Sequence, residues 1–217
     1  MDSQEMRRRM TEGKTYVASY LPKNPNKRFV EKFNRAPTRM RTKRTEYLRK
    51  AFGSLGKNAY LEPPFYCDHG YNIHIGDNFY ANTDLIILDQ CPVTIGDNVF
   101  LGPRIGIYCA MHPIAASVRN LQLEWGKPVT IGNNVWIGGD VTICPGVKIG
   151  NNVVIGAGAV VAKDIPDNCV AVGSPCKKIR DITEEDEKYW KEQLELFRSE
   201  TGIKLDKPAF CFDDNNN

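Results

Sequence analysis

The stretch that decides the fold reads Ile131-Gly-Asn-Asn-Val-Trp136, Ile137-Gly-Gly-Asp-Val-Thr142, Ile143-Cys-Pro-Gly-Val-Lys148, Ile149-Gly-Asn-Asn-Val-Val154, Ile155-Gly-Ala-Gly-Ala-Val160 and Val161-Ala-Lys-Asp-Ile-Pro166. An aliphatic residue opens every hexad. Positions one and five lie four residues apart, so on an extended strand they face the same side. Glycine, asparagine and aspartate between them tolerate the backbone angles of a tight corner.

This period of six fits neither an α-helix nor a long alternating strand. It predicts short strands joined by corners, with three sides making one coil of a triangular prism. Coils stacked about 4.8 Å apart would bury the aliphatic residues of neighbouring coils against one another. The pattern also occurs upstream, at Ile75 and Ile95. A β-sandwich is the alternative, but its turns come every 8–12 residues.

The hexads resemble those of the hexapeptide-repeat proteins, which implies a left-handed parallel β-helix. We expect the β-helix over residues 57–182, with an inserted loop at 108–128 that contains no hexads. Residues 1–56 form an N-terminal helical segment in this interpretation, with helices at 3–20 and 26–52 that cap the prism. Residues 183–217 form a C-terminal helix that opens at a Thr183 capping box and runs to about Phe197, followed by a polar tail from Lys207 that we expect to be frayed.

Composition is that of a soluble globular protein, with 41% hydrophobic and 25% charged residues in 217. No apolar run is long enough to cross a bilayer, and the polar start is not a secretory signal. Residues 1–50 carry fifteen Lys or Arg and five Asp or Glu. With no nucleic-acid motif beside it, this charge is interpreted as a solvated helical face.

Seven scattered cysteines indicate free thiols in a reducing compartment rather than a disulfide framework or a nucleophile. We therefore expect a cytoplasmic protein.

Only three histidines are present, His69, His74 and His112, and His112 lies in the hexad-free loop. An imidazole with a pKa near 6.5 suits the removal of a proton from an attacking hydroxyl at neutral pH. From its position alone, a loop histidine is more often a surface residue than a catalyst.

Several longer segments resemble the maltose and galactoside O-acetyltransferases, over roughly residues 5–182. They are Asn72–Asn82, the His112-Pro113 pair, Gly126–Gly138, Gly156-Ala-Gly158, Lys163–Pro166 and Gly173-Ser-Pro175. The Cys67–Tyr71 stretch favours the maltose branch. The resemblance implies transfer of acetyl from acetyl-CoA to a hydroxyl of a mono- or disaccharide, in a homotrimer whose active sites lie between subunits. It requires no metal and no covalent acetyl-enzyme.

The resemblance also implies roles for individual residues. His112 would be the general base, and Asn82 would position the acceptor and stabilise the transition state. Asp68 and Asp89 would hydrogen-bond sugar hydroxyls beside Trp136. The residues implied for acetyl-CoA are Gly139, Ala157, Ala162, Lys163, Lys177 and Arg180, with a backbone N–H near Gly139 facing the oxyanion.

Three positions depart from that family. Ala18-Ser19-Tyr20 lacks an acceptor-site acid found in the galactoside branch, Asp68 replaces a serine, and Lys177 replaces an arginine and loses its bidentate geometry. These changes concern the choice of acceptor more than the chemistry.

Three alternatives remain open. A β-helical zinc hydratase of the carbonic-anhydrase type needs three histidines, and His69 and His74 have an H-x4-H spacing. A non-catalytic scaffold would not need His112. The same reaction on an amino sugar, an antibiotic or an amino acid would keep the site and change only the acceptor.

Overall fold

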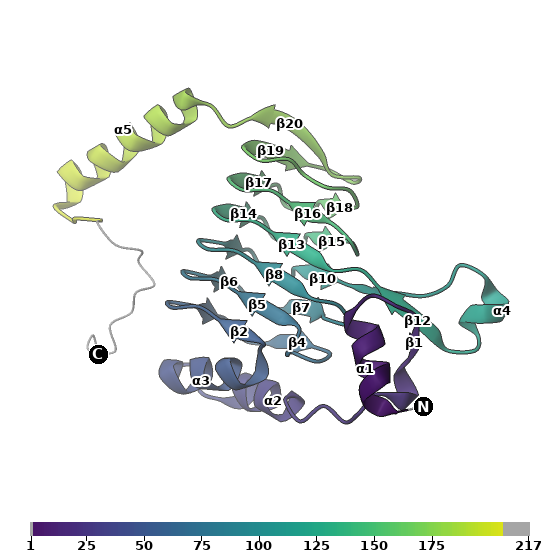
Figure 1. Ribbon diagram of the computed structural model, residues 1–217. Coiled ribbons are helices and arrows are strands. Elements are labelled where there is room, and N and C mark those ends of the chain that lie inside the picture. Colours follow the sequence, from purple (N-terminus) through teal and green to yellow (C-terminus); the bar gives the residue numbers. More distant parts are fainter. Residues whose placement is uncertain (1, 206–217) are drawn as a thin grey trace.

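The structure, a computed structural model, describes residues 2–205. Its centre is a prism of stacked coils with three sheet sides, as Figure 1 shows. Side 1 contains β4 (Phe65–Cys67), β7 (Leu85–Leu88), β10 (Gly106–Tyr108), β15 (Thr142–Ile143) and β18 (Val160–Val161). Side 2 contains β2 (Ser54–Leu55), β5 (Ile73–Ile75), β8 (Val93–Ile95), β13 (Val129–Ile131) and β16 (Lys148–Ile149). Side 3 contains β3 (Tyr60–Leu61), β6 (Tyr80–Ala81), β9 (Phe100–Leu101), β14 (Val135–Ile137), β17 (Val153–Ile155), β19 (Cys169–Val172) and β20 (Lys177–Asp181).

Neighbouring coils pair in parallel and in register with respect to the hexads. Ile95 lies beside Ile131 on side 2, and Ile137 lies beside Ile155 on side 3. Among the described strands of the three prism sides, β20 alone runs antiparallel, against β19. This confirms the parallel β-helix predicted from the hexads, although its first strand, β2, begins at Ser54, three residues before the boundary we expected.

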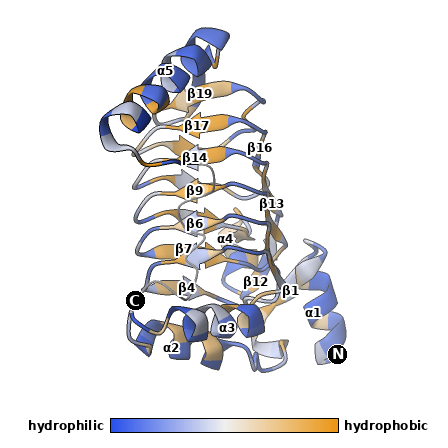
Figure 2. Cartoon of the chain, turned by 90° about the vertical axis from the view of Figure 1, so that its left-hand side faces the viewer, coloured by the Kyte–Doolittle hydropathy of each residue, from blue (hydrophilic) through white to orange (hydrophobic). Residues whose placement is uncertain are grey.

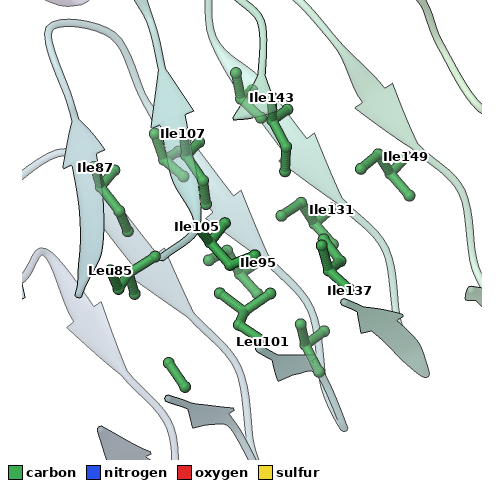
Figure 3. Close-up of a cluster of buried hydrophobic side chains, with 14 of the residues drawn as sticks. Leu85, Ile87, Ile95, Leu101, Ile105, Ile107, Ile131, Ile137, Ile143 and Ile149 are labelled. Carbon is green, nitrogen blue, oxygen red and sulfur yellow. The ribbon is translucent and has the colours of Figure 1, made fainter. Parts of the chain in front are cut away.

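The core of the prism consists of the first and fifth residues of each hexad. Ile131, Ile137, Ile143 and Ile149 are all buried, and Figure 3 shows their side chains directed into the space between the three sides. In Figure 2 the strands carry hydrophobic residues along the whole stack, whereas the corners are mostly hydrophilic. Stacking the coils therefore removes one continuous apolar column from water, and this burial stabilises the fold.

The corner between sides 2 and 3 explains why the hexads begin with Ile-Gly-Asp/Asn-Asn. Asn78, Asn98 and Asn134 all adopt left-handed backbone angles there, with φ of 56°. Their side chains form a ladder, in which the amide of Asn78 donates to Asn98 at 2.9 Å and that of Asn98 to Asn134 at 3.0 Å. Asparagine tolerates this conformation and supplies the cross-coil hydrogen bond as well.

The glycine of each such hexad is required by close approach of the next coil. A Cβ on Gly96 would lie 2.3 Å from Asn133 Oδ1 and 2.8 Å from the carbonyl oxygen of Gly132. We therefore expect Gly96→Ala to lower the free energy of unfolding by about 1–3 kcal/mol, because a well-packed site must shift. Thr94→Ala, at an exposed position of β8, should change it by less than about 0.5 kcal/mol. Denaturant unfolding at one fixed protein concentration measures both, and equal stabilities would contradict the packing argument.

Helices cover the lower end of the prism. α2 (Lys27–Arg35) and α3 (Arg41–Ala51) lie beneath the first coil in Figure 1, where Phe33 and Leu48 join the core cluster that contains Phe65. The expected helix over 26–52 is thus two helices separated at Pro37. α5 (Glu184–Thr201) extends from the upper end and begins with the predicted capping box, in which Thr183 and Asp186 satisfy each other's backbone N–H groups.

The expected helix over 3–20 is wrong in its second half. α1 (Ser3–Thr11) ends before Gly13, which has φ +72°. The chain then forms β1 (Tyr16–Val17) and one 3-10 turn (Ala18–Tyr20). The reason is a distant partner, since Tyr16 pairs antiparallel with Glu124 in the inserted loop. Tertiary pairing overrides local helix propensity in this segment.

The inserted loop has regular structure of its own. It contains β11 (Ala110–Met111), α4 (Ala116–Arg119) and β12 (Leu123–Gly126), and β12 lies between β1 and β11 in a three-stranded sheet. Figure 1 shows it projecting from the prism on the side away from α5. The expectation for the tail from Lys207 lies outside the described residues. Within residues 2–205 no helix is long and apolar enough to span a membrane.

Candidate active site

Two edges of the prism carry the residues singled out from the sequence. Edge 3–1, where side 3 turns into side 1, contains Asn82, Gly139 and Ala157, which follow β6, β14 and β17; the coil of β9 lies between the first two. Edge 1–2, where side 1 turns into side 2, contains Asp68 and Asp89 after β4 and β7. Because the coils stack in register, residues of one edge line up along the axis of the prism.

Asn82 stands at the lower part of edge 3–1. Its Oδ1 accepts a hydrogen bond from the backbone N–H of Thr83 at 2.8 Å, which fixes the side chain at the start of the corner. With Oδ1 engaged, the amide NH2 is the group that Asn82 has left to donate. The position therefore suits a donor to an oxygen atom of a substrate.

A hollow of about 520 Å³ opens beside Asn82 on side 3. It is lined by Tyr80, Asn82, Phe100, Leu101, Gly102 and Trp136. Phe100 pairs with Tyr80 below and Trp136 above, so the three rings point outward from adjacent coils. Trp136 is 58% exposed in the single chain, and its indole is thus available to a ligand or to another subunit.

Gly139 lies two coils above Asn82 on the same edge. Its carbonyl accepts from the N–H of Gly158 at 2.9 Å. Within the described residues its own N–H donates to no backbone or side-chain acceptor, although most backbone donors around it are used by the coil. A free, fixed N–H on the same edge as Asn82 has the character of an oxyanion-hole donor.

The upper coils carry the remaining residues expected for acetyl-CoA. Ala162 and Lys163 follow β18 on edge 1–2, and Lys177 and Arg180 lie on β20; all four are exposed. Arg180 donates two hydrogen bonds to the carboxylate of Asp186, at 2.6 and 2.9 Å. This ion pair raises the pKa of Arg180 and holds the guanidinium against the start of α5.

His112 follows directly on β11 in the projecting loop. The β11–β12 hairpin pairs Ala110 with Gly126 and Met111 with Trp125, and β1 flanks β12 on the other side. The imidazole is exposed in the single chain. A three-stranded sheet thus supports the backbone just before His112, and the exposed ring is open to a ligand or to a neighbouring subunit.

Asp68 is held by several neighbours near the base of that loop. Gln90 donates to its carboxylate, and Asn24 donates to the carbonyl oxygens of Asp68 at 3.2 Å and His69 at 2.8 Å. The side chain remains partly exposed. Its fixed position and partial exposure suit a carboxylate that accepts hydrogen bonds from a ligand.

Asp89 differs from Asp68, because its side chain is fully buried. Its two oxygens accept from the backbone N–H groups of His69 at 2.8 Å and Asn72 at 3.4 Å. Burial raises its pKa to about 7, against the effect of these hydrogen bonds. The position fits a residue that shapes the 68–72 loop better than one that contacts a sugar directly.

The two sets of polar groups lie apart within one chain. Asn82 and Gly139 belong to edge 3–1, whereas Asp68 and the His112 loop belong to edge 1–2. A side of five or six residues at about 3.3 Å each spans roughly 15–20 Å. One chain alone therefore does not bring His112 and Asn82 together.

Within the described residues of one chain, the histidines are not gathered into a metal site. His74 lies on β5, and its ring nitrogen is within 3.2 Å of the hydroxyl of Ser54. Among residues 2–205 there is no group of three His, Cys, Asp or Glu side chains placed to hold a metal ion. The H-x4-H spacing of His69 and His74 thus corresponds to a loop and a strand rather than to a ligand pair.

Comparison with known proteins gives the context of this arrangement. Residues 128–163 match the family described as "Bacterial transferase hexapeptide (six repeats)", and residues 92–107 match "Hexapeptide repeat of succinyl-transferase". A putative acetyltransferase of Saccharomyces cerevisiae is 52% identical over 80% of this chain and 91% of its own. A maltose O-acetyltransferase from Clostridium difficile 630 has a solved structure with 48% identity and a TM-score of 0.79, covering 84% of this chain and 98% of that one.

A galactoside acetyltransferase solved in complex with coenzyme A also superposes, with 42% identity, a TM-score of 0.79 and coverage of 84% and 93% of the two chains. This chain belongs to the galactoside and maltose O-acetyltransferase family. Membership confirms the resemblance identified in the sequence and makes the protein an acyltransferase. For an acetyltransferase of this family, the residues on the two edges described above are the candidate site.

Sequence reasoning missed three residues near the candidate site of this acetyltransferase: Tyr16, Gln90 and Glu124. Tyr16 was assigned to a helix, and Gln90 lies beside the more conspicuous Asp89. Glu124 lies in a loop for which the hexad period gives no register. The available signal was the short Leu-Glu-Trp-Gly run at 123–126, whose partner strands are distant in sequence.

Proposed function

We propose that this acetyltransferase moves the acetyl group of acetyl-CoA to a hydroxyl of a small sugar, of the maltose, glucose or galactoside type, with His112 as general base. The observation that carries the proposal is the division of the site between two edges of one prism. Such a division suits a groove between two subunits, in which edge 1–2 of one faces edge 3–1 of the next. A relative named as a maltose O-acetyltransferase and a galactoside acetyltransferase solved with coenzyme A support the chemistry.

We propose a homotrimer of parallel prisms with three such grooves. A heterologous interface that repeats around a threefold axis closes on itself and gives three equivalent sites. The exposed aromatic hollow on side 3, with Trp136 at its upper end, lies beside edge 3–1 and would wall each groove.

The mechanism follows from the groups at each edge. His112 takes the proton from the acceptor hydroxyl as its oxygen attacks the thioester carbonyl. The new carbon–oxygen bond leaves a tetrahedral oxyanion, which accepts hydrogen bonds from the N–H of Gly139 and the amide of Asn82. The carbon–sulfur bond then breaks, and the imidazolium of His112 returns the proton to the departing thiolate. Much of the acceleration comes from holding both substrates in one groove.

Substrates would occupy opposite ends of the groove. Asp68 would accept hydrogen bonds from the sugar, with its loop shaped by Asp89. Towards the upper coils, Ala157 and Ala162 would allow close approach of the pantetheine arm. Lys163, Lys177 and Arg180 would meet the phosphates, Arg180 with the N–H donors that its pairing with Asp186 leaves free.

We further propose that the protein acts in the cytoplasm. The six cysteines of the described residues all carry free thiols, which suits a reducing compartment.

The proposal is tested with the purified protein, acetyl-CoA and a panel of acceptors, by following release of the free thiol of CoA. We expect release above the rate of hydrolysis with maltose, glucose or a galactoside, and mass spectrometry should find one acetyl ester on the sugar. Amino sugars, amino acids and an aminoglycoside form the comparison set. Activity confined to the amines of that set, or no activity on any sugar, would overturn the sugar hydroxyl as acceptor.

A further inference from the structure

Glu124 lies on β12, the middle strand of the three-stranded sheet in the inserted loop that contains His112. The register of the β11–β12 hairpin pairs Ala110 with Gly126 and Met111 with Trp125, where β11 ends, and continuing that register by one residue would place His112 opposite Glu124. On its other side Glu124 pairs with Tyr16 of β1. Directly opposed residues of an antiparallel pair point to the same face, about 5 Å apart. Tyr16 and Glu124 therefore lie in one row across this sheet, and the continued register would add His112 to that row.

The carboxylate of Glu124 is fixed on one side and open on the other. The hydroxyl of Tyr16 donates to its Oε2 at 2.6 Å, and Tyr16 itself is only 2% exposed. Burial, together with the neighbouring Glu124, raises the pKa of the Tyr16 hydroxyl, so it remains a donor. In the described part of the chain, Oε1 of Glu124 has no hydrogen-bond partner. An ionised carboxylate has about four acceptor sites, and among the described residues one of them is used here.

Glu124 shares its surroundings with Asp68. Burial lowers the pKa of His69, and both Asp68 and Glu124 act against this effect while Arg7 and Lys27 add to it. The imidazole of His69 packs on Tyr71 with ring centroids 5.1 Å apart, and the guanidinium of Arg7 covers that tyrosine at 3.8 Å. Both carboxylates are partly exposed, and each is held by a buried polar side chain, Gln90 or Tyr16.

We propose that Glu124 is a second acceptor-binding carboxylate, which takes a hydrogen bond from a sugar hydroxyl next to the one that His112 deprotonates. The inference rests on the proposed function and goes beyond it, because it assigns acceptor choice to Glu124 and to the N-terminal strand that holds it. That strand and the 3-10 turn after it, residues 16–20, contain no acid. Tyr16 supplies instead a hydroxyl that pre-orients an acid on the loop, which reduces the entropy lost on binding.

A carboxylate at this point selects acceptors with hydrogen-bond donors. A sugar with adjacent hydroxyls can give one to His112 and one to Glu124, with Asp68 accepting a third. An analogue lacking the hydroxyl that meets Glu124 leaves a desolvated charge without a partner, which weakens binding strongly.

Glu124→Gln keeps the size of the side chain and removes its charge. We expect the KM for the sugar to rise about 10- to 100-fold, since hydrogen bonds to charged groups contribute that much to affinity. The KM for acetyl-CoA and kcat should stay within about twofold, as no contact with acetyl-CoA is lost. Tyr16→Phe should raise the sugar KM by a smaller factor, and Glu192→Gln, an exposed charge on α5, should leave all constants unchanged.

A second experiment uses deoxy analogues of the sugar that is acetylated most efficiently. For the wild type, one analogue should be a much poorer substrate than the parent sugar. For Glu124→Gln, the same analogue should be as good as the parent sugar, because the variant and the analogue each remove the same contact. A variant with an unchanged sugar KM, or with equal losses for both substrates, would overturn this role for Glu124. A wild type that acetylates no sugar at all would instead overturn the proposed function.

Discussion

Replacing His112 with alanine is expected to reduce kcat for acetyl transfer about 10²- to 10⁴-fold, the usual contribution of a positioned general base. Without the imidazole, the acceptor hydroxyl must attack while still protonated. The side chain is exposed on the loop, so the unfolding transition should not move. Initial rates of CoA release and the thermal midpoint measure the two effects.

A variant of a second histidine serves as the control, because it removes an imidazole that is not the proposed general base. His74 lies on β5 beside Ser54, away from both edges, and His74→Ala should keep kcat within about twofold. The KM for acetyl-CoA in His112→Ala should change little, because the base acts on the acceptor. If His112→Ala transferred acetyl at the normal rate, another group would be the base, or the protein would be a scaffold whose loop histidine has no catalytic role.

Asn82 is expected to give the second large effect. Asn82→Asp retains an oxygen for the N–H of Thr83, so the corner keeps its hydrogen bond of 2.8 Å, but the NH2 donor is lost. Removing one donor to a developing oxyanion typically costs about 10²- to 10³-fold in kcat. The added negative charge opposes the oxyanion further. Steady-state kinetics with both substrates varied should show the loss in kcat.

Two further variants control this experiment. Asn82→Ala removes the donor without adding charge and should lose somewhat less activity than Asn82→Asp. Asn120→Asp, an exposed change in the loop, should leave kcat unaltered. Wild-type kcat in both Asn82 variants would exclude its amide from the transition state and leave the N–H of Gly139 as the oxyanion donor on that edge.

The prism could be predicted from sequence because each hexad encodes its own geometry. Ile137 and Val141 are both buried, as their positions in the hexad require, and Asn98 adopts the left-handed angle at the corner. The same phase places Gly139 and Asn82 on one edge, two coils apart. Local residue chemistry repeated at a fixed period was thus sufficient for this part of the fold.

The rest depends on contacts that are distant in sequence. Tyr16 becomes a strand residue because it pairs with Glu124, which lies 108 positions further along the chain. The helix-like pattern of the residues around Tyr16 gives no sign of that partner. Asp89 and Gln90 are adjacent in the chain, yet one carboxylate is buried and the neighbouring amide reaches Asp68. The turn of the corner decides which of two neighbouring polar residues faces a substrate. The hexads lose their phase at this corner, so the sequence does not show which residue that is.

Oligomerisation is the other contribution that the hexads do not specify. The chain separates His112 from Asn82 by the width of side 1, so the proposed chemistry requires a second subunit. This requirement makes the site sensitive to assembly, and dilution or interface mutations should reduce activity and trimer content together.

Subunit complementation tests this account most directly. His112→Ala and Asn82→Asp are each inactive in the account above, but a mixed trimer contains grooves in which the native His112 of one subunit faces the native Asn82 of another. After unfolding and co-refolding of equal amounts, random assembly around a closed ring should restore about a quarter of the wild-type activity per groove. Co-refolded mixtures no more active than the two variants refolded separately would show that both residues act from the same chain, and would contradict the intersubunit site.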